Sequence, residues 1–255
     1  MTKTAIITGS NRGIGRAIAL RLAADGANVV LCARDQALLD STAAEIQAAG
    51  GRAHAVSLDL RLPESASTLV QSALDAFGRL DIVVNNAGAT KRGDFETLSD
   101  DDWADGYALK LFGAVRVTRA AWPHLRASTG AVVNIAGSGG RTPGPQFTIG
   151  GSVNAALLSL TKALADLGLR DGVQVNAVNP GPVRTARFEK RLAQTAADHG
   201  VGTAEALEIF LREEKITKVG DPEDIAELVA FILSPHGRLL HGSIIDADGG
   251  ATKTL

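Results

Sequence analysis

The chain reads AIITGSNRGIG from Ala5 to Gly15, so a short apolar run passes directly into a turn that holds three glycines. The next residues, Ile14 to Asp25, have the spacing of an amphipathic helix. Three glycines permit a tight turn and a close approach to backbone N–H groups, and a helix N-terminus adds a favourable dipole. The order strand, turn, helix therefore predicts a phosphate-binding turn. The alternative is a tight turn without a ligand.

Similar apolar runs recur along the chain and alternate with longer amphipathic segments. The predicted strands are Ala5–Thr8, Asn28–Cys32, Ala53–Leu58, Ile82–Asn85, Ala131–Ile135, Val173–Val178 and Ser243–Asp246. The predicted helices are Ile14–Asp25, Gln36–Ala49, Leu69–Phe77, Asp101–Leu125, Ser152–Leu169 and Glu223–Leu233. The strands lack inside–outside alternation, which indicates burial on both faces. Repeated βα units then predict one α/β domain over residues 1–255, with a doubly wound parallel sheet of about seven strands.

Composition limits the partners of the protein. The net charge of −2, with acidic and basic residues interspersed, gives no sign of a nucleic-acid or membrane-surface partner. No apolar stretch reaches the roughly 18–20 residues that span a bilayer, and the first residues lead into a strand without a signal peptide, so we expect a cytoplasmic protein. The single cysteine, Cys32, excludes an intramolecular disulfide and a cysteine-rich zinc site. We expect a buried thiol and no metal.

Residues Thr185–Val219 differ from the rest of the chain because they are charged, weakly periodic and placed before the last βα unit. Insertions of this length often cover a binding site. We expect a substrate-covering segment, with a plain surface excursion as the alternative.

The end of the second predicted strand bears on the choice of cofactor. A carboxylate at this point would accept the ribose hydroxyls of NAD(H) and repel a 2′-phosphate. Arg34 stands there instead, and Arg12 lies inside the glycine turn. Two guanidinium groups suit a phosphate, and Asp35 at the next position is expected to point away from the ribose. The sequence predicts NADP(H) in preference to NAD(H).

Further motifs lie after the later strands. They are Asp59-Leu60, Asn85-Asn86-Ala87-Gly88, Pro180-Gly181 with Thr185, and Asp248-Gly249-Gly250. With the glycine turn, they make the chain resemble a classical short-chain dehydrogenase/reductase over nearly its whole length. The resemblance implies a single-domain Rossmann fold, a small-molecule substrate, and homodimers or homotetramers. The predicted cofactor-binding residues are Gly9, Asn11, Arg12, Gly13, Ile14, Gly15, Arg34, Asp59, Leu60, Asn86, Ala87, Gly88, Pro180, Gly181, Val183 and Thr185.

The resemblance breaks at the catalytic positions. Enzymes of this family carry a serine after the fifth strand, a tyrosine and a lysine on the next helix, and an asparagine on the preceding long helix. In a gapless register these positions hold Gly137, Gly150, Asn154 and Lys110, respectively. We therefore expect a divergent member that lacks the Asn-Ser-Tyr-Lys set and has an atypical active site.

Three side chains are candidates for catalysis. Lys110 stands where the family has an asparagine, and Asn154 stands where the family has a lysine. The two side chains are either a retained functional pair or relics without a function. Ser138, one residue beyond the family's serine, either contacts substrate or satisfies the backbone of its loop. The single tyrosine, Tyr107, lies one turn before Lys110 and is more typical of a packed aromatic.

Five cationic side chains lie near the expected pocket: Lys91, Arg92, Arg141, Arg184 and Arg187. Each alone is typical of solvated surface, but together they favour an anionic substrate. The sequence thus predicts an NADP(H)-dependent oxidoreductase that transfers hydride to or from a carbonyl or imine. The alternative is a catalytically inactive, dinucleotide-binding homologue that acts as a sensor, scaffold or partner subunit.

Overall fold

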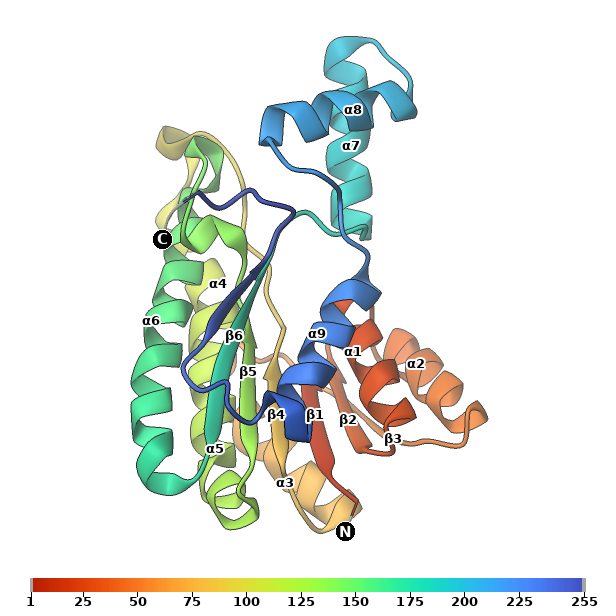
Figure 1. Cartoon of the computed structure of the whole chain (residues 1–255), viewed down its shortest axis with the longest axis vertical. Helices are drawn as coiled ribbons and strands as arrows, with labels where there is room; N and C mark the ends of the chain where they lie inside the picture. The colour runs from red at the N-terminus through yellow and green to blue at the C-terminus, as the bar shows by residue number, and fades with distance from the viewer. Residues whose placement is uncertain (1, 254–255) are drawn as a thin grey trace.

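Seven parallel strands form one sheet in the order β3-β2-β1-β4-β5-β6-β7 (Figure 1). The computed structural model describes residues 2–253, and residues 1, 254 and 255 of the predicted domain lie outside them. The strands are β1 (Thr4–Thr8), β2 (Asn28–Ala33), β3 (Arg52–Ser57), β4 (Ile82–Asn85), β5 (Ala131–Ile135), β6 (Gln174–Pro180) and β7 (Ile244–Ala247). The chain crosses from one half of the sheet to the other between β3 and β4, beside β1. Ligands of open α/β sheets bind at the carboxyl ends of the strands at such a crossover.

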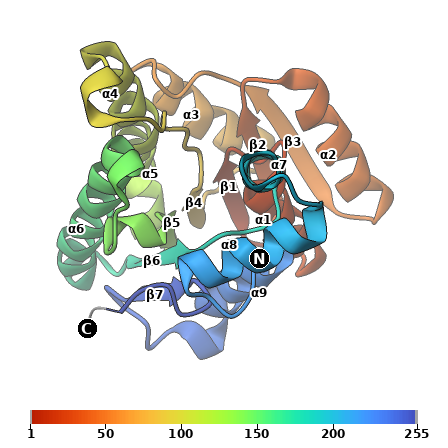
Figure 2. The same cartoon turned by 90° about the horizontal axis from the view of Figure 1, so that it is seen from above.

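Helices cover both faces of the sheet (Figure 2). They are α1 (Gly13–Ala24), α2 (Gln36–Ala48), α3 (Ser65–Phe77), α4 (Asp100–Tyr107), α5 (Gly113–Ser128), α6 (Thr148–Asp171), α7 (Ala186–His199), α8 (Thr203–Glu214) and α9 (Pro222–Leu233). The helices α1, α2 and α9 pack on one face, and α3, α5 and α6 pack on the other. The expected single-domain Rossmann fold is confirmed. Within residues 2–253, no helix is both long and apolar enough to cross a membrane.

The core lies on both sides of the sheet because successive strand residues point to opposite faces. In β1, Ile7 packs into the cluster with α1 and α9, whereas Ile6 packs into the cluster with α3 and α5. Both side chains are fully buried. Cys32 is buried as expected, and burial raises the pKa of its thiol to about 12. The strands are apolar along their length because helices cover both faces of the sheet.

The prediction of one long helix over Asp101–Leu125 is wrong in one respect, because the structure interrupts this helix. Helix α4 ends at Tyr107, the segment Ala108–Phe112 forms a π-helical turn, and α5 begins at Gly113. A π turn adds one residue per turn and rotates the side chains that follow, and such turns are frequent at functional sites. Lys110 lies within this turn.

The segment 185–219 folds into α7 and α8, which project beyond the sheet at the end where the strands finish (Figure 1). The two helices share a small core of their own. Within it, the rings of Phe188 and Phe210 meet edge to face, with centroids 5.3 Å apart. The helix pair is thus a packed unit with a core of its own.

Candidate functional site

The glycine turn between β1 and α1 has the geometry of a ligand cradle. Gly9 and Gly13 have φ angles of +68° and +54°, where residues with a β-carbon are strained. A β-carbon at Gly15 would lie 2.3 Å from the carbonyl oxygen of Gly9. The residue before α1, Arg12, makes no side-chain cap, so its side chain leaves the first N–H groups of the helix free. The turn therefore fits an anionic group such as a pyrophosphate.

Asn86 fixes this turn to the end of β4. Its side-chain Nδ2 donates to the carbonyl oxygens of Thr8 and Gly9 at 2.9 and 3.2 Å. The backbone N–H groups of Asn86 and Ala87 both donate to the Thr8 hydroxyl at 2.9 Å. These bonds bring residues 8–9 and 86–87 together at the carboxyl edge of the sheet.

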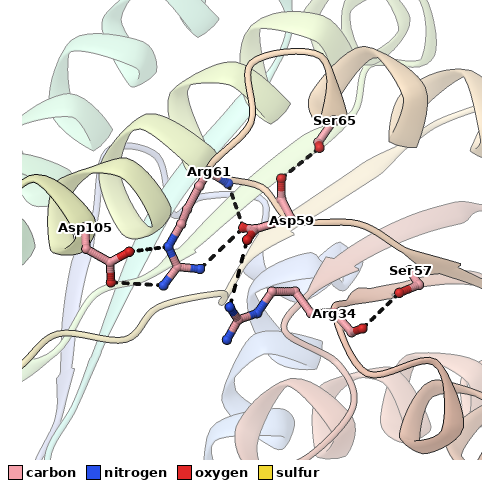
Figure 3. A network of polar contacts seen from close by, with 6 residues as sticks. All are labelled: Arg34, Ser57, Asp59, Arg61, Ser65 and Asp105. Carbon is pink, nitrogen blue, oxygen red and sulfur yellow. Dashed lines mark hydrogen bonds and ion pairs between the residues drawn. The ribbon is translucent and has the colours of Figure 1, made fainter.

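A polar network lies beside the end of β2 (Figure 3). Arg61 pairs with Asp59 at 3.3 Å and also with Asp105, so both carboxylates are held by one guanidinium. Arg34 approaches Asp59 only to 3.9 Å, and 67% of its side chain is exposed. Asp35 points away, because its carboxylate accepts the backbone N–H of Leu38 and caps α2. Arg34 is thus available for a further anion, and Asp35 is engaged elsewhere.

The residues after β6 approach the glycine turn from the other side. Gly181 donates its N–H to the carbonyl of Ala247 at 3.0 Å, and a β-carbon at Gly181 would lie 2.7 Å from the backbone of Asp248. Thr185 caps the N-terminus of α7, and its methyl group would lie 3.2 Å from a β-carbon on Gly13. Helix α7 therefore starts directly beside the phosphate-binding turn.

Lys110 reaches the end of β5 rather than bulk water. Its Nζ donates to the carbonyl oxygen of Ala136 at 2.5 Å, and its methylene stem packs against Gly88, where a β-carbon would lie 2.8 Å from Cδ. Burial lowers the pKa of Lys110 to about 7, and the nearby positive charge of Arg187 contributes to the same shift. A side chain with this pKa can both donate and accept a proton at neutral pH.

Asn154 lies on α6 and meets the same loop. It is buried, and its Nδ2 would lie 2.9 Å from a β-carbon on Gly137. Its Oδ1 is buried without a hydrogen-bond partner among residues 2–253. Lys110 and Asn154 thus both reach residues 136–137, from the π-helical turn and from α6. An unpartnered buried oxygen is costly, so this oxygen is available to accept a hydrogen bond.

Gly137 adopts a backbone conformation that favours glycine. Its φ is +148°, and its N–H donates to Oδ1 of Asn179 at 3.1 Å. Asn179 in turn donates to Asp246, which pairs with Arg141 at 3.3 Å. This network holds the loop after β5 in a backbone conformation that would be strained if residue 137 were a serine.

An aromatic ring covers Gly150. A β-carbon at Gly150 would lie 2.0 Å from Cε2 and Cζ of Phe147, and a β-carbon at Gly139 would lie 2.8 Å from the opposite edge of the same ring. The guanidinium of Arg92 lies over the ring, with Cζ 4.0 Å from its centroid. Phe147 therefore fills the space beside residue 150 and carries a cation on its face.

Comparison with known proteins shows the family to which the chain belongs. The family described as enoyl-(acyl carrier protein) reductase matches residues 9–252. The chain belongs to the short-chain dehydrogenase/reductase family. It is 39% identical over 252 residues to an uncharacterized oxidoreductase of Mycobacterium tuberculosis, an alignment that covers 98% of this chain and 92% of that protein.

Two solved structures are similar to this short-chain dehydrogenase/reductase over nearly its whole length. The crystal structure of L-sorbose reductase from Gluconobacter frateurii, complexed with NADPH and L-sorbose, is 33% identical with a TM-score of 0.95, and the match covers 100% of this chain and 98% of that one. The crystal structure of a variant of actinorhodin polyketide ketoreductase with NADPH is 30% identical with a TM-score of 0.93, over 99% and 98% of the two chains.

The third candidate, Ser138, and the single tyrosine, Tyr107, lie on different elements, the turn after β5 and the end of α4. Ser138 opens the short helical turn Ser138–Gly140, and its carbonyl accepts N–H groups from Arg141 and Thr142 at 2.9 and 3.1 Å. Tyr107 stacks on Trp103, with ring centroids 6.5 Å apart. The ring of Tyr107 thus belongs to a packed aromatic group.

The expected cluster of five cations needs correction, because three of them are paired with carboxylates. Lys91 pairs with Asp102 at 2.8 Å, Arg141 with Asp246 at 3.3 Å, and Arg184 with Asp221 at 3.5 Å. Sequence proximity to the pocket could not reveal these partners. Arg92 and Arg187 form no ion pair within 4.0 Å among residues 2–253.

Sequence analysis missed Phe147. The available signal was its spacing, because it stands three residues before the glycine that replaces the family's tyrosine. Such spacing places a bulky ring within reach of the vacated position at the start of α6.

A cavity of about 360 Å³ lies elsewhere, beside β7 and the start of α9. It is lined by Lys218, Asp224, Asp246 and Asp248, among others. None of Lys110, Asn154 and Ser138 lines it. Asp246, which lines the cavity, is connected through Asn179 to the backbone of Gly137 after β5.

Proposed function

We propose that this protein is an NADP(H)-dependent oxidoreductase with an atypical active site, in which Lys110 replaces the family's tyrosine as the proton donor. Its substrate would be a carbonyl or an imine, or the corresponding alcohol or amine. The observation that carries the proposal is the position of Lys110, whose Nζ lies 2.5 Å from the carbonyl of Ala136 and has its pKa lowered to about 7.

The glycine turn, residues 86–88 and the start of α7 would hold the dinucleotide. Arg12 and Arg34 would bind the 2′-phosphate, and the free N–H groups of α1 would bind the pyrophosphate. The similarity to two NADPH complexes supports this choice. A bound nicotinamide would supply or accept the hydride.

Lys110 would manage the proton. In reduction, the carbonyl carbon gains the hydride while the oxygen takes a proton from the Lys110 ammonium, which leaves an alcohol and a neutral amine. The amine then regains a proton from water. In oxidation, the neutral amine accepts the hydroxyl proton. General acid–base catalysis contributes about 10²–10⁴-fold, so an ammonium can replace much of what the absent phenol supplies.

Asn154 and Ser138 would support this chemistry. The unpartnered Oδ1 of Asn154 could hold a water on the turn that Lys110 also contacts. Ser138 would contact the substrate from the same loop. Helices α7 and α8 would cover the bound substrate, since α7 starts beside the glycine turn.

A second candidate is a homologue that binds the dinucleotide without turnover and acts as a sensor, scaffold or partner subunit. Phe147 favours it, because an apolar ring fills the space beside residue 150 and supplies no proton. In either case, family resemblance favours homodimers or homotetramers. Leu169 on α6 and Leu239 before β7 are 72% and 96% exposed, which fits association through these elements.

One set of measurements separates the two candidates. NADPH binding is titrated by fluorescence, and carbonyl and imine substrates are then screened for NADPH oxidation. We expect turnover that falls by about 10²-fold or more in Lys110→Met and is retained in Tyr107→Phe. Binding without turnover across the panel would support the sensor. Loss of turnover in Tyr107→Phe alone would overturn the role of Lys110.

A further inference from the structure

We infer that the substrate carries a carboxylate and that Arg92, held over the ring of Phe147, binds it. The inference rests on the proposed function, because it names the substrate class of the same site. It concerns a binding group on the substrate, distinct from the proton donor.

The ring of Phe147 packs on two glycines. β-Carbons at Gly139 and Gly150 would lie 2.8 and 2.0 Å from ring atoms, so the ring occupies the space that side chains at both positions would fill. The guanidinium of Arg92 lies 4.0 Å from the ring centroid, so the aromatic face positions it.

The loop that carries Arg92 is also anchored. The N–H of Gly93 donates to the carbonyl of Gln146 at 3.2 Å, and the Gln146 side chain donates to Asp94 at 3.3 Å. These bonds connect the loop after β4 to the loop after β5. A guanidinium placed by two connected loops suits specific recognition, because little conformational entropy is lost on binding.

Positive charge accumulates around this ring. Arg187 donates to the carbonyl of Gly88 at 3.1 Å, on the same glycine that the Lys110 stem contacts. The pKa of Arg92 is lowered by desolvation and by the charge of Arg191, whereas the nearby Glu214 raises it. Glu214 already pairs with Arg191. The local carboxylate is thus engaged, and a bound anion would relieve the repulsion among the remaining cations.

Arg92 and Arg187 contact different parts of the site. Arg187 donates to the carbonyl of Gly88, in the motif after β4, and the charge of Arg12 lowers its pKa. Arg92 lies over the ring of Phe147, directly before α6, and the charge of Arg187 contributes to its lowered pKa. An anion bound at Arg92 would therefore also be attracted by Arg187.

A carboxylate fits the free edge of Arg92. With one face of the guanidinium against the ring, its N–H groups remain available in the plane, and two of them can pair with both oxygens of a carboxylate. An arginine on an aromatic face is favourable in itself, and this contact reduces the cost of ordering the side chain on binding.

The test measures binding rather than turnover. Pyruvate, acetoacetate and 4-oxopentanoate are each compared with their methyl esters by calorimetry, in the presence of saturating NADP⁺. The series varies the distance between the carbonyl and the carboxylate. We expect at least one acid to bind tenfold or more tightly than its ester. Arg92→Met should reduce this ratio to within twofold, and Phe147→Leu should reduce it in part.

The matched control is Lys91→Met, which removes a neighbouring positive charge that Asp102 already pairs. It should leave the ratio unchanged. Equal binding of acids and esters, no binding of any acid, or a ratio that survives in Arg92→Met would overturn the inference. Acid-selective binding that depends on Arg92, without turnover of any substrate, would instead contradict the proposed function, and only the role of Arg92 in binding a carboxylate ligand would remain supported.

Discussion

The ring of Phe147 lies against Gly150 so closely that a β-carbon at residue 150 would approach two ring atoms to 2.0 Å. The pair accounts for both residues at once. Glycine at 150 leaves room for the ring, and the ring fills the room that the missing side chain leaves. The departure from the family's tyrosine is therefore a packed arrangement rather than a vacant position.

The first prediction concerns Gly150→Tyr. The new side chain must displace Phe147, so we expect a loss of about 1–3 kcal/mol in the free energy of unfolding, measured by urea denaturation. The double variant Gly150→Tyr with Phe147→Ala should recover part of this loss, because the displaced ring is absent. A single variant as stable as the wild type would show that the ring moves freely.

The second prediction concerns Gly137→Ser, which restores the family's serine. The φ of +148° strains any residue with a β-carbon, and that carbon would lie 2.9 Å from Nδ2 of Asn154. We expect a cost of about 1–3 kcal/mol and no gain in turnover. The matched control is Ser138→Gly, which should leave the backbone of the loop unstrained. A gain in turnover in Gly137→Ser would indicate that the loop relaxes.

The third prediction is the pH dependence of the rate. With a pKa of about 7, Lys110 is charged below neutral pH and neutral above it. For carbonyl reduction, kcat/KM should be flat on the acid side and fall tenfold per pH unit above the pKa. Oxidation of the alcohol should show the opposite limb. In Lys110→Met, the pH dependence of both reactions should disappear. If either pH dependence persists in this variant, it belongs to another titratable group.

The fourth prediction is the pH dependence of stability. The pKa of Lys110 falls from 10.5 to about 7 in the fold, so the unfolded chain binds more protons between these values. The stability of the wild type relative to Lys110→Met should therefore rise with pH from about 7 to 10.5 and stay constant below 7. Thermal unfolding across this range tests the trend. A constant difference would mean that Lys110 has an ordinary pKa.

The fifth prediction concerns cofactor preference. Arg34→Met removes an exposed guanidinium that is only loosely paired with Asp59, at 3.9 Å. We expect NADPH binding to weaken about tenfold or more and NADH binding to change little, because a charge-assisted hydrogen bond contributes about 1.5–3 kcal/mol. The control Asp35→Ala removes the cap of α2, with a cost of about 1 kcal/mol in stability and no change in the NADPH-to-NADH ratio. Equal weakening of both nucleotides in Arg34→Met would contradict the role.

The sequence alone predicted the strands to within about two residues and the glycine turn, because both depend on local patterns. Apolar runs without alternation occur where a strand is covered on both faces, and positive φ angles favour glycine. Asp35 caps α2 in the structure. Its capping role depends only on residues three positions apart.

The tertiary structure alone decided which charges are free and which cation lies over the ring of Phe147. Lys91, Arg141 and Arg184 looked equivalent to Arg92 and Arg187 until their carboxylate partners were located. Arg92 and Phe147 are far apart in the chain, and they meet only because loops after neighbouring strands converge at one edge of the sheet. Pairing of charges and packing of rings depend on such long-range contacts, and no local pattern in the chain encodes them.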